Sequence, residues 1–345
     1  MYTLPHMLRE PESARSVPTA PAPPAIPPLP TAIGFVGAGL VRPECVLATA
    51  RGDLYAADWR GGVSHVRPDG SQALYTGTLP DGRKPRPNGI ALRRDGGFLF
   101  ADLGEALGGV FELRRDGTVR SVVQAVDGID LPPSNFVHED ALGRVWITVS
   151  TRHAPRSAAY RADVADGFIV LADERGARIV ADDLGYTNEA LPSPDGRYVY
   201  VNETFARRLT RYRMSASGSL HSRETITTFG AGTFPDGLAF DADGGIWITS
   251  IVSNRIIRVA PDGSQRIMLE DNDPAHLAVV EQAFLSGAMG KPHLDEVRSE
   301  RLKNVSSLAF GGPDLRTAFL GCLLGDAIAT FRTAFTGVPP VHWLY

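Results

Sequence analysis

The sequence repeats one pattern six times, and this repeat limits the possible folds more than any other feature. Each unit opens with a polar turn containing Gly or Asp, followed by a short apolar strand, as in TARGDLYAAD (49–58) and DADGGIWITS (241–250). A further strand that ends in a turn comes next, as in NRIIRVAPDGS (254–264). A unit of four short strands that recurs about every 45–55 residues is typical of a β-propeller blade.

We therefore predict an all-β fold, a six-bladed propeller with four antiparallel strands per blade, over residues 32–345. The segment AIGFVGAGLV (32–41) precedes the first unit, and we expect it to supply the outer strand of the last blade and close the ring. Its VGAGL run resembles the start of a dinucleotide fingerprint, but Arg42 occupies the third glycine position and no helical pattern follows. The 36 glycines and 26 prolines agree with many short strands and turns.

Two regions lie outside the repeat. Residues 1–31 contain the proline-rich run PTAPAPPAIPPLP, which predicts a disordered or polyproline arm, with a ligand for a partner domain as the alternative. Residues 269–301 form the longest insertion, where apolar residues at helical spacing begin at Pro274 and end near Gly287. This predicts a helical insertion between blades five and six, on the face of the channel mouth. It forms either a lid over the site or a cap packed on the rim.

The composition restricts the partners and the location of the protein. Net charge is −4 with acidic and basic residues interspersed, so we expect no nucleic-acid partner. No apolar run approaches the ~18–20 residues of a membrane span. The N-terminus lacks the apolar core of a signal peptide, so we expect a cytoplasmic protein without a membrane partner. Cys45 and Cys322 form no metal-binding pattern, and we expect two buried free thiols, with a disulfide as the alternative.

The residues immediately before the innermost strand of each blade are rich in side-chain oxygen. In a propeller these strands start at one end of the central channel, so residues in this register converge on the axis. The segments are RPECVLA, RPNGIAL, PSNFVHED, GYTNEALP, FPDGLAF and KNVSSLAF. The converging set holds two carboxylates and three amides. These are Glu44, Asp236, Asn88, Asn135 and Asn188.

The pairs Asp236-Gly237 and Asp243-Gly244 lie in one unit but have different interpretations. Asp243-Gly244 occupies the hairpin turn of the repeat, where such pairs supply the positive φ that the turn demands. Asp236 falls in the converging register, so we expect its carboxylate at the mouth of the channel.

A divalent cation would remove the repulsion between the two converging carboxylates, one of which would otherwise have to take up a proton. Carboxylate and amide oxygens suit a hard ion such as Ca²⁺, Mg²⁺ or Mn²⁺. No Cys or His lies in the register to build a thiolate or imidazole site. The alternative is that each Asn or Asp only forms its own turn, because both types are common turn formers.

At these residues the sequence resembles the SMP-30/gluconolactonase/LRE-like family. The matching text is PECVLA, RPNGIAL, PDGLAFDADGGIWIT and VSSLAFGGPDLRTAFL, and the resemblance covers about residues 34–335. It implies a six-bladed propeller with one divalent metal in the channel mouth, Ca²⁺ by preference and Zn²⁺, Mn²⁺ or Mg²⁺ otherwise. It also implies hydrolysis of lactones, chiefly sugar lactones. The ligands carried over are Glu44, Asn135, Asn188 and Asp236.

The third blade departs from the family's pattern. Sugar lactonases of the family often carry an Arg two residues before the metal-binding Asn, where it grips the sugar acid, and an Asp after that Asn. This chain reads Pro133-Ser134-Asn135-Phe136 instead. We therefore expect a lactone less polar than a sugar lactone, with Phe136 against an apolar part of it.

Other residues near the predicted mouth are candidates for substrate contact. The segment STRHAPRSAAYR (150–161) follows the second strand of blade three. Arg152 could therefore clamp an anion and His153 could act as an acid or base, with a solvated loop as the alternative. Asn88 could bind the substrate or a water on the metal, or hold its own turn. His138 is expected to be a wall or core residue.

The sequence thus predicts a divalent-metal-dependent hydrolase, a lactonase that opens a small-molecule lactone with metal-activated water. Asp236 is the candidate base, or it is only a ligand. Two other functions stay open. The first is another metal-dependent reaction on this scaffold, such as phosphotriester hydrolysis or hydration and elimination. The second is a non-catalytic ligand-binding propeller, against which the set of converging oxygen ligands argues.

Overall fold

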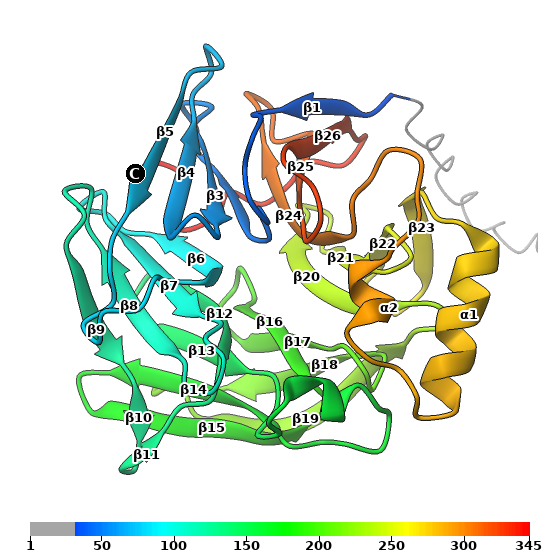
Figure 1. Ribbon diagram of the computed structural model, residues 1–345, viewed down its shortest axis with the longest axis horizontal. Coiled ribbons are helices and arrows are strands. Elements are labelled where there is room, and N and C mark those ends of the chain that lie inside the picture. The colour runs from blue at the N-terminus through cyan, green and yellow to red at the C-terminus, as the bar shows by residue number, and fades with distance from the viewer. Residues whose placement is uncertain (1–31) are drawn as a thin grey trace, which may run out of the picture.

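The six sequence units fold into six four-stranded antiparallel sheets, arranged as blades around a central channel (Figure 1). The structure is a computed structural model that describes residues 32–345. The predicted six-bladed propeller is confirmed. The proline-rich arm predicted for residues 1–31 lies outside the described residues.

The first five blades each use four successive strands, with the first strand innermost (Figure 1). Blade one consists of β2 (Val46–Ala48), β3 (Leu54–Asp58), β4 (Gly62–Val66) and β5 (Gln72–Thr76). Blade two consists of β6 (Pro87–Leu92), β7 (Phe98–Asp102), β8 (Gly109–Leu113) and β9 (Val119–Val123). Blade three consists of β12 (Ser134–Glu139), β13 (Val145–Val149), β14 (Gly167–Asp173) and β15 (Gly176–Leu184). Blade four consists of β16 (Thr187–Pro192), β17 (Tyr198–Glu203), β18 (Arg208–Met214) and β19 (Leu220–Thr228). Blade five consists of β20 (Phe234–Phe240), β21 (Ile246–Ile251), β22 (Arg255–Val259) and β23 (Gln265–Glu270).

The two ends of the domain close the ring in blade six. This blade contains β24 (Val305–Gly311), β25 (Thr317–Cys322) and β26 (Ile328–Arg332), and its outer strand is β1 (Gly34–Val36), which pairs antiparallel with β26. The predicted closure by the N-terminal strand is therefore confirmed. Because β1 covers the edge of β26, the last blade keeps the same four-stranded width as the others.

Large apolar side chains fill the layers between neighbouring blades. Trp247 of blade five is fully buried and packs edge-on against Phe310 of blade six, with ring centroids 5.2 Å apart. Phe100 and Phe111 stack within blade two at 5.6 Å. The core is therefore a ring of layers between blades, and the axis of the molecule is left for the residues of the innermost strands.

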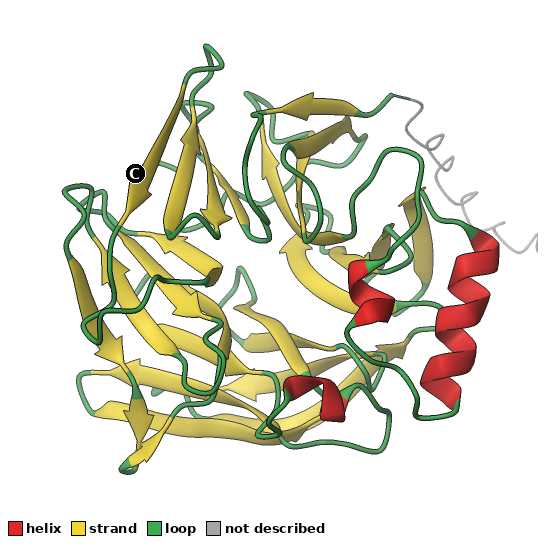
Figure 2. Cartoon of the chain, in the orientation of Figure 1, coloured by secondary structure: helices red, strands yellow, loops and turns green. Residues whose placement is uncertain are grey.

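The predicted helical insertion is also confirmed (Figure 2). Helix α1 (Pro274–Leu285) begins at the predicted proline, and the Asp273 side chain caps it by accepting hydrogen bonds from the N–H groups of Ala275 and His276. Its last residue, Leu285, is 68% exposed. The other short elements are α2 (Pro292–Asp295), the 3-10 helix η1 (Arg156–Ala159) and the hairpin of β10 (Ala125–Val126) and β11 (Ile129–Asp130).

Helix α1 packs on the rim of blades four and five. Phe284 contacts Phe205 and Phe234, with ring centroids 6.2 and 5.4 Å apart. Glu281 forms an ion pair with Arg207 at 2.6 Å. These contacts hold the helix to the rim and favour the cap over the lid. Among residues 32–345, no helix has the length and apolar character needed to cross a membrane.

The hairpin turns at the end of the channel opposite the strand starts follow the predicted repeat. The carboxylate that accepts hydrogen bonds in the blade-five turn is that of Asp241 rather than that of Asp243. Gly244 has a φ of +79°, which confirms Asp243-Gly244 as a turn. The Asp241 carboxylate accepts hydrogen bonds from the N–H groups of Asp243 and Gly245 and from Trp247 Nε1, the last at 2.8 Å. The first Asp of the turn, rather than the Asp-Gly pair, therefore ties the hairpin to the buried indole.

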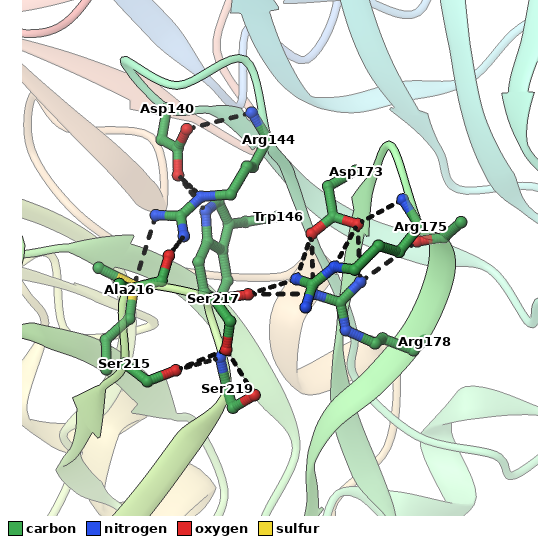
Figure 3. Close-up of polar contacts among 12 residues, drawn as sticks. Asp140, Arg144, Trp146, Asp173, Arg175, Arg178, Ser215, Ala216, Ser217 and Ser219 are labelled. Carbon is green, nitrogen blue, oxygen red and sulfur yellow. Dashed lines mark hydrogen bonds and ion pairs between the residues drawn. The ribbon is translucent and has the colours of Figure 1, made fainter.

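Blade three repeats this arrangement (Figure 3). Trp146 Nε1 donates to Asp140 Oδ2 at 2.9 Å, and Arg144 Nε donates to the same oxygen at 2.7 Å. Both hairpins share the spacing Asp-x-x-Gly-x-x-Trp. The repeat thus encodes a turn and its attachment to the core together.

Candidate metal and catalytic site

The five residues predicted to converge lie at the start of the innermost strands, and all are buried. Glu44 immediately precedes β2, and the others are the second or third residue of β6, β12, β16 and β20. Glu44 is the most exposed of them at 7%.

A β-bulge interrupts the ladder at this position in four of these strands. The pairing with the second strand of the blade shifts register across Asn88, Asn135, Asn188 and Asp236. A bulge leaves its residue out of the ladder and re-aims its side chain. The bulges therefore explain why polar side chains in apolar strands can turn toward the channel axis.

Hydrogen bonds link four of the five side chains into a chain across blades. Asn88 Nδ2 donates to Glu44 Oε1 at 2.6 Å and to the Asn135 backbone oxygen at 2.9 Å. Asn135 Nδ2 donates to Asn188 Oδ1 at 2.7 Å, and Asn188 Nδ2 donates to Thr204 Oγ1 at 3.1 Å. The structure thus brings residues of four blades into direct contact.

Asp236 differs from the other four because no hydrogen bond reaches its carboxylate from any residue in 32–345. Its burial, followed by the negative charges of Glu44 and Glu189, raises the pKa of Asp236 well above the usual range. The positive charges of Arg42 and Arg156 act in the opposite direction without outweighing these effects. A bound cation would offset the neighbouring negative charges and lower the pKa of Asp236.

Glu189 is a third carboxyl group of the site that the sequence analysis missed. It follows Asn188 within the bulge of β16, and its Oε2 accepts a hydrogen bond from the Leu238 N–H at 2.8 Å. Burial raises the pKa of Glu189 to about 8, and the charge of Glu44 acts in the same direction. The available signal was a glutamate inside the innermost strand of GYTNEALP.

Two arginines contact the cluster, and neither was predicted. Arg42 Nε donates to Glu44 Oε2 at 3.2 Å. Arg156, the first residue of η1, donates from Nη2 to Asn135 Oδ1 at 3.2 Å and to Ser150 Oγ at 3.1 Å. The position two residues before Asn135 holds Pro133 rather than an arginine, as the sequence showed. The loop after β13 supplies one from 21 residues further along the chain.

The structure does not bring Arg152 and His153 to the cluster. Nη1 and Nη2 of Arg152 donate to the carboxylate of Asp182 in the outermost strand β15, at 2.8 and 2.9 Å. His153 Nδ1 lies 2.8 Å from Asp166 Oδ2. Their partners are thus surface carboxylates, which favours the solvated-loop alternative.

Phe136 lies in the channel below the cluster, where it borders a cavity. It is 7% exposed and packs in an apolar cluster that includes Cys45 and Ile90. Cys45 and Cys322 are buried free thiols, as predicted. The apolar side chain that suggested a less polar substrate therefore faces away from the predicted mouth.

The donor set fits a hard divalent cation. Glu44 and Asp236 supply carboxylate oxygens, and Asn135 and Asn188 supply amide oxygens. Asn88 Oδ1 is buried and has no hydrogen-bond partner among residues 32–345, so an oxygen at the cluster is unsatisfied there. Within residues 32–345, no three side chains of the types His, Cys, Asp and Glu group so as to hold an ion, so the amides are needed to complete the set.

Residues 42–279 match the model of the SMP-30/Gluconolactonase/LRE-like region. The chain is 27% identical over 282 residues to the 6-deoxy-6-sulfogluconolactonase of Pseudomonas putida, which covers 80% of this chain and 81% of that enzyme. It is 27% identical over 243 residues to pentonolactonase XacC of Haloferax volcanii, covering 69% and 67%.

Among solved structures, the calcium-binding protein regucalcin from Agrobacterium tumefaciens has the same fold. Its TM-score is 0.60 at 18% identity, and the match covers 88% of this chain and 96% of that one.

Proposed function

Because the chain belongs to the SMP-30/gluconolactonase/LRE-like family, we propose that it is a divalent-metal-dependent lactonase. The observation that carries the proposal is the Asp236 carboxylate, which is buried without a donor beside a ring of side-chain oxygens. Both similar enzymes are lactonases by name, which supports the reaction class.

Glu44, Asn135, Asn188 and Asp236 would hold the ion, for which we propose Ca²⁺ before Mg²⁺, Mn²⁺ or Zn²⁺. When bound, such an ion polarises a carbonyl oxygen and lowers the pKa of water. By holding the ion, these four residues would orient the lactone carbonyl relative to Asp236.

Asp236 accepts the proton of the attacking water, because no hydrogen bond in the described chain occupies its carboxylate. Asn88 Oδ1 has no hydrogen-bond partner in the described chain, and it orients a hydroxyl group of the substrate or the water. If Asp236 were only a ligand, removing its charge would weaken metal binding and turnover in parallel.

Arg156 favours a polar lactone. Ring opening produces a carboxylate, and a guanidinium at the site pairs with such a group through charge-assisted hydrogen bonds. Its 3.2 Å hydrogen bond to Asn135 places this group against a proposed ligand. With Phe136 below the cluster, both reasons for a less polar substrate lose their support, and a sugar-type lactone becomes our proposal.

A panel of lactones, from sugar lactones to apolar γ- and δ-lactones, tests this function by proton release. The panel is run with Ca²⁺, Mn²⁺ or Zn²⁺ and with a chelator. We expect metal-dependent turnover that prefers the polar members and is lost in Asp236→Asn. The matched control is Asp243→Asn, the same change in the exposed Asp-Gly pair of the same blade.

Two results would contradict the proposal. Turnover that persists with chelator and in Asp236→Asn would exclude the metal-dependent reaction. Turnover of apolar lactones alone would restore the less polar substrate and remove Arg156 from substrate binding.

A further inference from the structure

The central channel contains a cavity of about 530 Å³ below the cluster. At its inner end the wall is formed by Cys45, Phe136 and Glu189, which directly follow Glu44, Asn135 and Asn188 in the chain. At its other end the wall includes the exposed turn residue Leu142 of blade three. The cavity therefore runs from beneath the cluster to the face that carries the hairpin turns.

Apolar side chains from all six blades line this cavity, with Val46 and Leu47 from blade one. A volume of this size is within the range of small-molecule sites, which are mostly apolar with a few polar groups. Water in such a space finds few hydrogen-bond partners. The lining includes Ile90, Leu92, Val137, Leu191, Leu238 and Phe310.

The polar groups of the lining define what a ligand must offer. His342 Nε2 is buried and has no hydrogen-bond partner in the described chain. Burial lowers the pKa of His138 to about 4 and that of His342 to about 3, so both rings are neutral at pH 7. Glu189 closes the inner end, and Arg144, the arginine of the lining, is paired with Asp140, so the lining offers an anion no free guanidinium.

The walls of the cavity are tied together by contacts between distant segments. Arg144 of blade three pairs with Asp140 and donates from Nη1 to the Ala216 backbone oxygen of blade four at 3.2 Å (Figure 3). The C-terminal segment 338–342 forms another wall, where the Val338 N–H donates to the Phe240 backbone oxygen at 2.9 Å. The cavity is thus enclosed by fixed structure between the turns and the C-terminal segment.

We propose that this cavity is a second ligand site, which binds a neutral, largely apolar small molecule carrying one hydrogen-bonding group. The ligand enters from the face of the hairpin turns. The hydrogen-bonded chain from Glu44 through Asn88 and Asn135 to Asn188 crosses the channel above it. The site is therefore separate from the lactone site, and this inference does not depend on the proposed function.

Prodan, a neutral naphthalene fluorophore with one ketone, is the probe for this site. We expect saturable binding of one molecule per chain, with a blue shift of its emission. Ala239→Leu and Ala309→Leu each place a larger side chain in the lining and should weaken binding at least about tenfold, because filled space excludes the probe. Ala125→Leu in β10, outside the cavity, is the matched control and should leave binding unchanged.

Thiol modification tests the location without any substitution. Cys45 lines the cavity and Cys322 does not, and both are buried free thiols. Prodan should slow the reaction of Cys45 with a small neutral methanethiosulfonate, measured by peptide mass spectrometry, and leave Cys322 unaffected. Equal rates at Cys45 with and without prodan would overturn the proposal, as would unchanged affinity in both filling variants.

The two sites are also distinguished by one variant. Asp236→Asn should abolish lactone turnover and leave prodan affinity unchanged. Loss of prodan binding in this variant, or competition between prodan and a lactone substrate, would show that the cavity belongs to the lactone site and overturn the second site alone.

Discussion

Buried carboxylates between the strands of a blade and buried carboxylates in the channel mouth have opposite surroundings. Asp58 and Glu203 are fully buried within blades. Asp58 pairs with Arg60 at 2.7 Å, and Glu203 pairs with Arg208 at 2.6 Å. Burial alone would raise their pKa values, but these arginine hydrogen bonds outweigh it and hold the pKa of both groups below the usual range.

In the mouth, Glu189 and Asp236 have no such partner. Burial raises the pKa of both groups, and neighbouring carboxylates raise it further. The chain thus pairs Asp58 and Glu203 with arginines where these carboxylates hold strands together. At the mouth, Glu189 and Asp236 have no ion-pair partner among residues 32–345, and this is the property expected of a site that binds a cation.

The largest effect that should sharpen this contrast is that of Asp236→Asn on catalysis. Removal of a general base reduces turnover by roughly 10²–10⁴-fold. The variant removes the unpaired charge, so we also expect the metal-free protein to melt at a higher temperature than the wild type. Initial rates and calorimetry measure the two effects. A metal-free variant less stable than the wild type would show that Asp236 is paired in the fold.

Glu203→Gln should have the opposite effect on stability. It leaves Arg208 and Arg223 without their common carboxylate, and we expect a loss of about 3 kcal/mol in the free energy of unfolding. Urea unfolding gives this value. Glu224→Gln, at an exposed pair with Arg211, is the control and should change stability by less than about 1 kcal/mol. Equal effects of the two changes would remove the distinction between buried and exposed pairs.

Addition of Ca²⁺ should stabilise the wild type and not Asp236→Asn. At about 100 times its Kd, an ion that binds only the folded chain raises the free energy of unfolding by about 2.7 kcal/mol. Thermal melts with Ca²⁺ and with chelator measure this difference. The prediction fails if the ion stabilises Asp236→Asn as much as the wild type.

The smallest expected effect, taken per pH unit, is a pH dependence of stability that separates the two groups of carboxylates. The pKa of Glu189 rises from its ordinary value of 4.5 to about 8 on folding. Between these values the folded chain holds a proton that the unfolded chain has released, so metal-free stability falls as pH rises. One group contributes at most about 1.4 kcal/mol per pH unit.

Unfolding at several pH values, in wild type and in Glu189→Gln, isolates this contribution. The variant should have a smaller slope than the wild type between roughly pH 5 and 8, because Glu189 no longer contributes while Asp236, whose pKa is also raised, still does. Glu105→Gln, at an exposed glutamate, should keep it. A slope in Glu189→Gln as steep as that of the wild type would assign the pH dependence to other groups.

The sequence by itself determined the architecture and five positions of the site. The period of the repeat gives the number of blades, and turn residues such as Gly244 and the start of α1 at Pro274 depend on local backbone preferences. Because every blade starts at the same end of the channel, a shared register was enough to place Asp236 and Asn188 at the mouth.

Only the tertiary structure decided which groups surround these positions. Arg156 reaches Asn135 because a 17-residue loop between β13 and β14 folds back over the strand starts, and no local pattern encodes that path. The bulge in β16 directs Glu189 inward, and the enclosed cavity forms where the C-terminal segment meets the turns. Local preferences are set by neighbours in the chain, whereas charges and cavities depend on side chains that are distant in sequence and adjacent only after folding.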